Sequence, residues 1–485
     1  MALDNSDAHK VPDGMPVRSS SRDLLHGALV VDELADGWMR PWRLLPSQRR
    51  ALSSCMAWHP GLFSQMAQCT SGVTLSFETD ATQVALEVRV DPEPQGTTAQ
   101  LAFVDAMVDG THVASVERAR AAERDVAVPH DGLSCDVDGT HLACRMPSQG
   151  EGLVRFELAC AGEGDGMPTP AATPRHGSAL PGLVPGRSVR VWLPALRGCE
   201  VRDVACNGSF IRPVASAQGL AGSLLVLGDS IAQGFVTDDP ARSWPALVAS
   251  GLGCDLVNQG IGGQVFQETS LAGLASVGTP SYVVVALGAN YRFERCGASL
   301  VVGDVAAYLR HVARAWPEVP CLVVTPLWHA ERAWPSHPGS CWEDVPGIIT
   351  HEVARHANLY LLDGRGVMDA NRLLLADGFD HPDARGAEQV ADRVLAALGH
   401  RARVRDAGAA VAGRRGKGHG TGMSGKADVT PCAATARASR QDDVPGASGA
   451  ATAQRGRSPR PAGGRHEPGG PDAMTGQPGE QLRLV

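Results

Sequence analysis

Two regions of the chain differ in how their apolar residues are spaced. Before about residue 215, apolar and polar residues alternate, as in VTLSFE from Val73, VALEVRV from Val84 and VRVWLP from Val189. Because successive side chains of a strand point to opposite faces, this spacing predicts strands with one buried face. Turn signals such as DG, GDG and PG separate them. The pattern predicts an antiparallel, jelly-roll-like β-sandwich over residues 24–215.

Between residues 222 and 400 the apolar residues instead form short uninterrupted runs separated by helical stretches. The runs lie at residues 224–227, 256–257, 282–287, 322–324 and 359–362. Strands buried on both faces have this composition, and the intervening helices would provide the crossovers of a parallel sheet. This region predicts a three-layer α/β/α domain with a parallel five-stranded sheet.

The two ends of the chain lack such patterns. We expect residues 1–23 to form a flexible N-terminus and residues 401–485 a disordered tail, because the tail has too few large apolar residues to offset the entropy of ordering. The N-terminus lacks the apolar core of a secretory signal, and no run of 18 apolar residues follows. We therefore expect a cytoplasmic protein with no membrane partner.

Composition narrows the classes of function. A hydrophobic content of 43% and a charged content of 20% are typical of globular proteins. The net charge of -8 argues against nucleic acid as a partner, since phosphate binding needs a dense basic face. The 12 cysteines form no CxxC pair, so neither a zinc site nor a redox motif is indicated. We expect no metal and no cofactor.

The first run of the α/β region, SLLVLGDSIAQGF, ends in Gly228, Asp229 and Ser230, after which a helix is predicted. A serine at this junction lies at the carboxyl edge of the sheet, where open α/β folds bind ligands. Its backbone N–H would also face a developing oxyanion. Serine is equally a preferred helix N-cap, so this segment alone leaves both roles open.

Two later segments supply further donors at the same edge. The turn after the second run, residues 260–263, has three glycines, which allow backbone N–H groups to approach a ligand closely. The third run delivers Asn290, whose side-chain amide is a donor that does not titrate near neutral pH. Each segment by itself is also compatible with a purely structural turn.

A histidine follows the last run. His381 lies in ADGFDHPDARG, in a loop before an amphipathic helix, with Asp377 and Asp380 just before it. Imidazole acts as a general base at neutral pH, and a carboxylate on its other nitrogen fixes the tautomer. A carboxylate at either position would serve.

Together these four segments resemble the SGNH or GDSL-type esterases and acyltransferases, in the family's order and at compatible spacing. The resemblance covers residues 222–398 and implies a flavodoxin-like fold. It implies that Ser230 is the nucleophile and that His381 is the general base. It further implies an oxyanion hole formed by the N–H groups of Ser230 and Gly263, or Gly262 if the turn is shifted, and by Asn290.

The acidic member of the triad departs from the family pattern. The family places it three residues before the histidine, where this chain has Gly378. Asp377 is four residues before, and Asp380 is adjacent. We favour Asp377, because a loop folds a more distant residue back beneath the imidazole more readily, and keep Asp380 as the alternative.

The sequence thus predicts a serine ester hydrolase, of carboxylesterase or acetylesterase type, that acts on a small-molecule or carbohydrate acyl ester. Trp328 and His329, which follow the fourth run, are candidate substrate contacts. The alternatives are an acyltransferase that uses the same site and a catalytically weak carbohydrate-binding or scaffold protein. A nucleotide-binding protein is less favoured, since GDSIAQG has no GxGxxG spacing and no phosphate-binding lysine. The oligomeric state stays open.

Overall fold

The computed structural model of the protein describes residues 14–54, 62–92, 131–145, 147, 149–158, 186–215, 219–237, 239–292, 297–330 and 342–399. The predicted tail, residues 401–485, lies outside the described residues, as do residues 1–13 of the predicted N-terminus.

The described N-terminal region forms two antiparallel sheets, each of six strands. The first has the order β3 (Val30–Glu33), β4 (Met39–Trp42), β11 (Cys199–Cys206), β6 (Gln83–Val90) and β9 (Gly150–Glu157), with β1 (Val17–Ser20) also paired to β11. The second has the order β12 (Ile211–Pro213), β5 (Thr74–Thr79), β10 (Arg187–Trp192), β7 (Leu133–Val137) and β8 (Thr140–Arg145), with β2 (Leu25–His26) paired to β5.

Alternating side chains of both sheets build the core between them. Leu75 and Phe77 of β5 pack in one buried cluster with Leu86 and Val88 of β6 and with Val191 of β10. These are the positions at which the period-two pattern placed apolar residues, so the predicted β-sandwich is confirmed.

The N-terminal boundary differs from the prediction. Residues 17–20 form β1, in register with residues 203–206 of β11, and residues 21–24 form a 3-10 turn. Structure therefore begins before residue 24, because backbone pairing with β11 orders a segment too short for its pattern to be read. Two helices that the alternation did not predict, α1 (Pro46–Ser54) and α2 (Leu62–Met66), also lie in this region.

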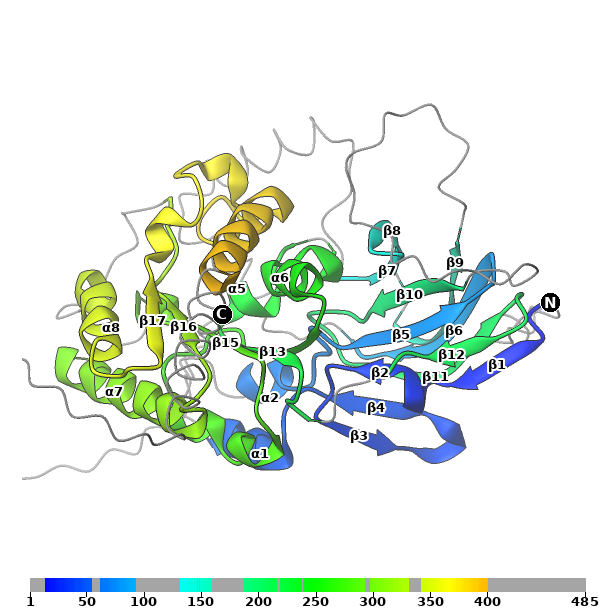
Figure 1. Ribbon diagram of the computed structural model, residues 1–485, viewed down its shortest axis with the longest axis horizontal. Coiled ribbons are helices and arrows are strands. Elements are labelled where there is room, and N and C mark those ends of the chain that lie inside the picture. Colours follow the sequence, from blue (N-terminus) through cyan, green and yellow to red (C-terminus); the bar gives the residue numbers. More distant parts are fainter. Residues whose placement is uncertain are drawn as a thin grey trace, which may run out of the picture. The chain divides into compact units, whose positions relative to one another are not determined.

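The C-terminal region contains the predicted parallel sheet of five strands, in the order β14 (Asp255–Gly260), β13 (Ser223–Gly228), β15 (Tyr282–Ala286), β16 (Cys321–Val324) and β17 (Leu359–Leu362). Each of the five predicted runs falls on one of these strands. The helices are α5 (Ser230–Gln233), α6 (Trp244–Leu252), α7 (Ala298–Ala315), α8 (Val345–Val353) and a last helix over 384–399 (Figure 1).

Helices cover both faces of this sheet. Apolar residues of α7 and α8 join one set of strand residues, including Leu225 and Val283, in a single cluster. Residues of α6 and of the last helix join the alternate set, including Leu224 and Val284. The three-layer α/β/α prediction is therefore confirmed. No described helix has both the length and the apolar character that crossing a membrane requires.

The register of the sheet fixes where the functional loops leave it. Gly228 at the end of β13 is level with Gly260 of β14 and Ala286 of β15. Strand order reverses between these neighbours, which is the switch point where open α/β sheets bind ligands. The loops that carry Ser230, Gly263 and Asn290 therefore start from adjacent positions on one edge.

Candidate active site

Ser230 is the first residue of α5, and it is buried. The N-cap is its neighbour Asp229, whose carboxylate accepts the backbone N–H of Ile231 at 3.1 Å. The capping role that the sequence left open for Ser230 thus belongs to Asp229. The serine hydroxyl is left for another contact.

That contact is with His381. The Ser230 hydroxyl oxygen lies 2.9 Å from Nε2 of His381, at hydrogen-bond distance, although the two residues are 151 positions apart in the sequence. The ring of Phe235 stacks on the imidazole with centroids 5.8 Å apart. A serine and an imidazole at hydrogen-bond distance form the pair that nucleophilic catalysis requires.

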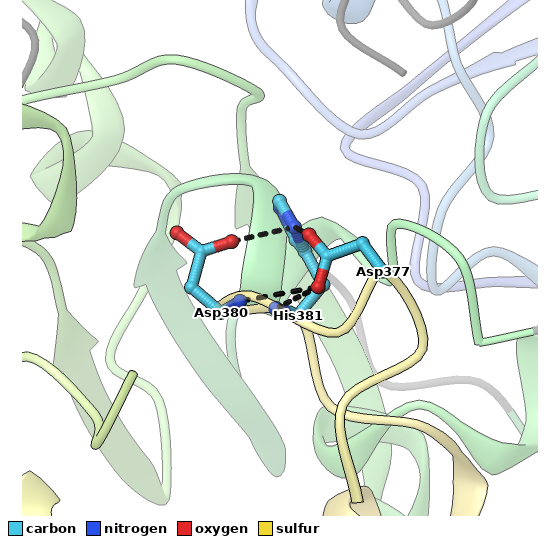
Figure 2. A group of neighbouring side chains, drawn as sticks. All are labelled: Asp377, Asp380 and His381. Carbon is cyan, nitrogen blue, oxygen red and sulfur yellow. Dashed lines mark hydrogen bonds and ion pairs between the residues drawn. The ribbon is translucent and has the colours of Figure 1, made fainter. Parts of the chain in front are cut away.

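Two carboxylates face the other nitrogen of the imidazole (Figure 2). Nδ1 of His381 lies 2.7 Å from Oδ2 of Asp377 and 2.9 Å from Oδ1 of Asp380. The second oxygen of Asp377 accepts the backbone N–H groups of Phe379, Asp380 and His381. These three bonds hold Asp377 rigidly within the loop. The structure brings both sequence candidates together at Nδ1.

Asp380 has a different counterpart, the guanidinium of Arg292. The guanidinium donates to the outer oxygen of Asp380 at 2.8 Å, and both side chains are buried. The guanidinium also lies over the rings of Phe379, at 4.5 Å, and Trp342, at 5.0 Å. Sequence reasoning missed Arg292, although it follows Asn290 by only two positions.

The charges around His381 set its protonation. Burial lowers the pKa of His381, but the negative charges of Asp380 and Asp377 outweigh burial and raise that pKa well above its usual value. Burial likewise opposes ionisation of Asp380, but the charges of His381 and Arg292 bring its pKa below the usual range. The neighbouring carboxylates therefore stabilise the imidazolium form of His381.

The ligand atoms of His381, Asp377 and Asp380 lie within 4.8 Å of one another, a spacing that a cation can also use. Both carboxylates already have compensating partners, the backbone N–H groups on Asp377 and the guanidinium on Asp380. We therefore interpret the cluster as a device that orients and charges the imidazole.

The glycine turn, residues 260–263, contacts helix α5. The Gly262 N–H donates to the side-chain oxygen of Gln233 at 2.8 Å, so this group is already used. Gly263 has a φ of 80°, a conformation that favours glycine, and its N–H has no acceptor among the described residues. Asn290 donates one amide hydrogen to the carbonyl of Gln264 at 3.0 Å, which ties it to the same turn. These contacts favour Gly263 over Gly262 as a free donor.

Residues 226–389 match the model of the GDSL-like Lipase/Acylhydrolase family. The chain contains a GDSL-like lipase/acylhydrolase domain. The matched span begins in β13 and ends in the last helix, so it includes Ser230, the glycine turn, Asn290 and His381.

Two solved structures share the arrangement of a sandwich followed by a GDSL-like domain. Salicylyl-Acyltransferase SsfX3 from a Tetracycline Biosynthetic Pathway is 18% identical, with a TM-score of 0.57 over 80% of this chain and 99% of its own. A putative GDSL-like lipase from Bacteroides ovatus ATCC 8483 is 13% identical, with a TM-score of 0.54 over 79% of this chain and 96% of its own. At these identities the likeness shows the shared fold. No curated protein matches the chain.

A small apolar pocket lies beside Ser230 in the GDSL-like domain. It is lined by Asp229 and Ile231 on either side of Ser230 and by apolar residues such as Leu287, Pro326 and Leu327. Burial in these surroundings raises the pKa of Asp229 to about 7, partly offset by the backbone N–H of Ile231. Burial of the carboxyl group that caps α5 thus favours its neutral form.

Trp328 and His329, the two candidate substrate contacts, lie in different surroundings. Trp328 packs against the cluster of α6 and the last helix. His329 lies edge-on to Trp342 and Phe379, with ring centroids 5.7 and 6.3 Å apart, so it joins the aromatic surroundings of Arg292. Their role as substrate contacts stays a prediction.

Proposed function

We propose that this protein is a serine ester hydrolase that cleaves a small acyl ester through an acyl-enzyme. The observation that carries the proposal is the continuous chain of contacts from the Ser230 hydroxyl through both nitrogens of His381 to Asp377, at 2.9 and 2.7 Å. Asp380 is a second carboxylate on the same nitrogen, which adds negative charge beside the imidazolium.

In the first half-reaction, the Ser230 oxygen attacks the ester carbonyl while its proton passes to Nε2 of His381. The tetrahedral oxyanion is stabilised by the N–H groups of Ser230 and Gly263 and by the amide of Asn290. The ester C–O bond then breaks, and the departing alkoxide takes the proton from His381. An acyl-enzyme and an alcohol result.

In the second half-reaction, a water molecule gives its proton to His381 as its oxygen attacks the acyl-enzyme. A second oxyanion forms at the same donors and collapses, the proton returns to the Ser230 oxygen, and the carboxylic acid leaves. The residues present supply every proton transfer in this cycle, so the proposed mechanism uses no cofactor.

A second candidate is acyl transfer, in which an alcohol replaces water in the second half-reaction. It is favoured by the similarity to a salicylyl-acyltransferase, which extends over 99% of that chain and includes the N-terminal sandwich region. Both candidates share the acyl-enzyme and differ only in the acceptor.

The acyl-enzyme is tested by labelling with a fluorophosphonate probe, which should modify the wild-type protein at Ser230, as read by peptide mass spectrometry. Acetyl to octanoyl p-nitrophenyl esters, with and without added alcohols, then separate hydrolysis from transfer. We expect release of free acid from the shorter esters. Transfer product in excess of free acid identifies an acyltransferase, whereas folded protein that resists the probe identifies the scaffold alternative.

The raised pKa of His381 predicts the pH profile. Only the neutral imidazole accepts a proton from Ser230, so kcat/KM should rise with pH and its acid limb should lie above 6.5, the ordinary histidine value. Asp380→Asn removes one negative charge beside the ring and should move that limb to lower pH. An acid limb below 6.5 in the wild type would show that the carboxylates do not dominate. Initial rates from pH 5 to 10 provide the measurement.

A further inference from the structure

The outer edge of β14 is covered by residues of the N-terminal region. Within the described parallel sheet, β14 is an edge strand that pairs only with β13. A Cβ on Gly27 would lie 2.4 Å from the carbonyl oxygen of Leu256, and one on Gly72 would lie 2.7 Å from the Cβ of Asn258. Backbone of the N-terminal region therefore approaches this edge more closely than any side chain allows.

At the carboxyl end of β14, a guanidinium takes the place of a neighbouring strand. Arg43 is fully buried, and its NH1 group donates to the carbonyls of Asn258, at 2.9 Å, and Gly260, at 2.6 Å. Its other nitrogens donate to the carbonyls of Cys69, at 2.9 Å, and Met66, at 2.7 Å. One planar side chain thus fastens the end of β14 to residues 66–69.

The electrostatics of Arg43 suit this role. Its four acceptors are all backbone carbonyls, so a buried cation is held by oriented dipoles and by no carboxylate. Burial lowers the pKa of Arg43 to about 10, and the side chain still stays charged at neutral pH. A lysine has neither the planar shape nor the number of donors to reach the same four oxygens.

Gln233 of α5 forms a second connection to the same turn, at Gly262, two residues after Gly260. Its side-chain oxygen accepts the Gly262 N–H, and its amide donates to the carbonyl of Ala195 at 3.2 Å. The Ser71 hydroxyl donates to the backbone carbonyl of Gln233 at 2.6 Å and accepts from the side chain of Asn258 at 2.9 Å. The turn is thereby held at both Gly260 and Gly262 by contacts that lead into the N-terminal region.

We propose that the N-terminal region positions the oxyanion turn, and that Arg43 and Gln233 are the positioning residues. This inference rests on the proposed function, since the Gly263 N–H matters only where an oxyanion forms. Because Gly260 and Gly262 are held by these contacts, the orientation of the next backbone N–H, that of Gly263, is also fixed. A misplacement of about 1 Å at such a group is enough to cost about 100-fold in rate.

Arg43→Met is the decisive variant, because it keeps an apolar chain of similar length and removes all four donors. We expect kcat on a short ester to fall about 10- to 100-fold with KM little changed, and binding of a tetrahedral boronate to weaken by a similar factor. Asn290→Ala, which removes a donor outright, gives the scale, with an expected loss of about 10² to 10³.

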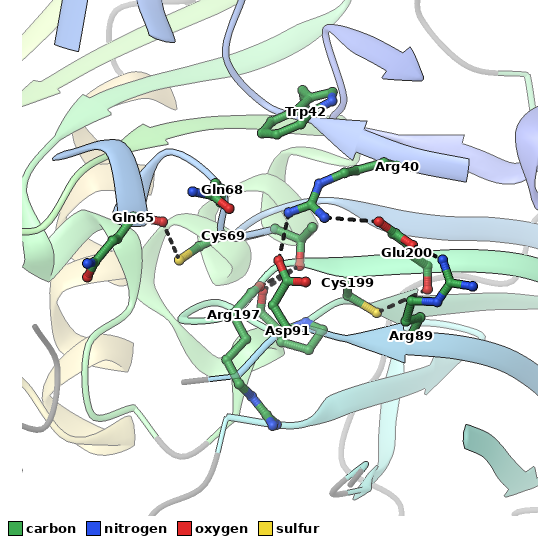
Figure 3. A network of polar contacts seen from close by, with 12 residues as sticks. Arg40, Trp42, Gln65, Gln68, Cys69, Arg89, Asp91, Arg197, Cys199 and Glu200 are labelled. Carbon is green, nitrogen blue, oxygen red and sulfur yellow. Dashed lines mark hydrogen bonds and ion pairs between the residues drawn. The ribbon is translucent and has the colours of Figure 1, made fainter. Parts of the chain in front are cut away.

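Arg40→Met is the matched control. Arg40 lies in the same region, and its ion pairs are with Asp91 at 2.6 Å and Glu200 at 2.9 Å (Figure 3). Its loss should lower the melting temperature while kcat stays within about threefold. Equal losses of kcat in the Arg43 and Arg40 variants would reduce Arg43 to a general stability role and overturn the inference.

Hydrogen exchange separates this inference from the proposed function. Exchange of the backbone N–H groups of residues 259–264 should quicken in Arg43→Met but not in Arg40→Met. Faster exchange in Arg43→Met, in a protein whose wild type has no esterase activity, supports the positioning role of Arg43 and rejects the proposed ester hydrolysis. Unchanged exchange rejects the positioning role. Should Arg43→Met fail to fold, Gln233→Met removes the acceptor of the Gly262 N–H together with the donor to the Ala195 carbonyl, and it should give the same signature.

Discussion

Replacing Ser230 with alanine should lower kcat for ester hydrolysis by at least about 10⁴-fold, which corresponds to about 5 kcal/mol of transition-state stabilisation. The reason is that no other hydroxyl on the described residues is bonded to His381, so the covalent step has no replacement nucleophile. Oxyanion donors alone leave only a residual rate. The measurement is the initial rate on p-nitrophenyl acetate with purified, folded protein.

Ser243→Ala provides the control for that variant. Ser243 is another buried serine, at the start of α6, and its hydroxyl donates to the carbonyl of Pro240. Its loss should leave kcat nearly unchanged. If Ser230→Ala hydrolysed the ester as fast as Ser243→Ala, the acyl-enzyme mechanism would have to be abandoned.

Asp377→Asn should lower kcat by about 10³- to 10⁴-fold, and Asp380→Asn by about tenfold or less. An asparagine at 377 keeps its oxygen on the three backbone N–H groups and therefore turns its amide toward Nδ1, which favours the tautomer that cannot accept the serine proton. An asparagine at 380 leaves Asp377 in place as the acceptor of the Nδ1 proton, 2.7 Å away.

The two variants carry equal changes in charge, so each is the control for the other. At a pH well above the acid limb the imidazole of His381 is neutral in both variants. Differences in kcat there report the orientation of the His381 ring and not its titration. A larger loss in Asp380→Asn than in Asp377→Asn would assign the orienting role to Asp380 and leave Asp377 as a structural loop residue.

Much of the fold followed from periodicity. Continuous runs such as 224–227 and 359–362 became strands β13 and β17, because residues buried on both faces leave a signal that survives without knowledge of the partner strand. Val17–Ser20 was missed because four residues carry too short a pattern, and only pairing with β11 reveals the strand.

The site divides in a similar way. Ser230 and His381 could be selected as candidates from the sequence because each stands in a local motif at a strand or helix end, and the structure brings the two side chains into contact. Arg292 and Arg43 were not, because their partners are distant in sequence: Asp380 is 88 positions from Arg292, and Asn258 is 215 from Arg43. An arginine among apolar residues, as in PWRLL, is the only local sign that such a side chain is buried.

The contacts that cover β14 limit which N-terminal domains could stand beside this sheet. Unpaired backbone carbonyls on an edge strand can pair with a strand from another molecule. In this protein the guanidinium of Arg43 binds the carbonyls at the end of β14. A different N-terminal domain could replace the sandwich only if it supplied equivalent donors to the carbonyls of Asn258 and Gly260. Exchange of the whole N-terminal domain is thereby constrained at the edge of β14.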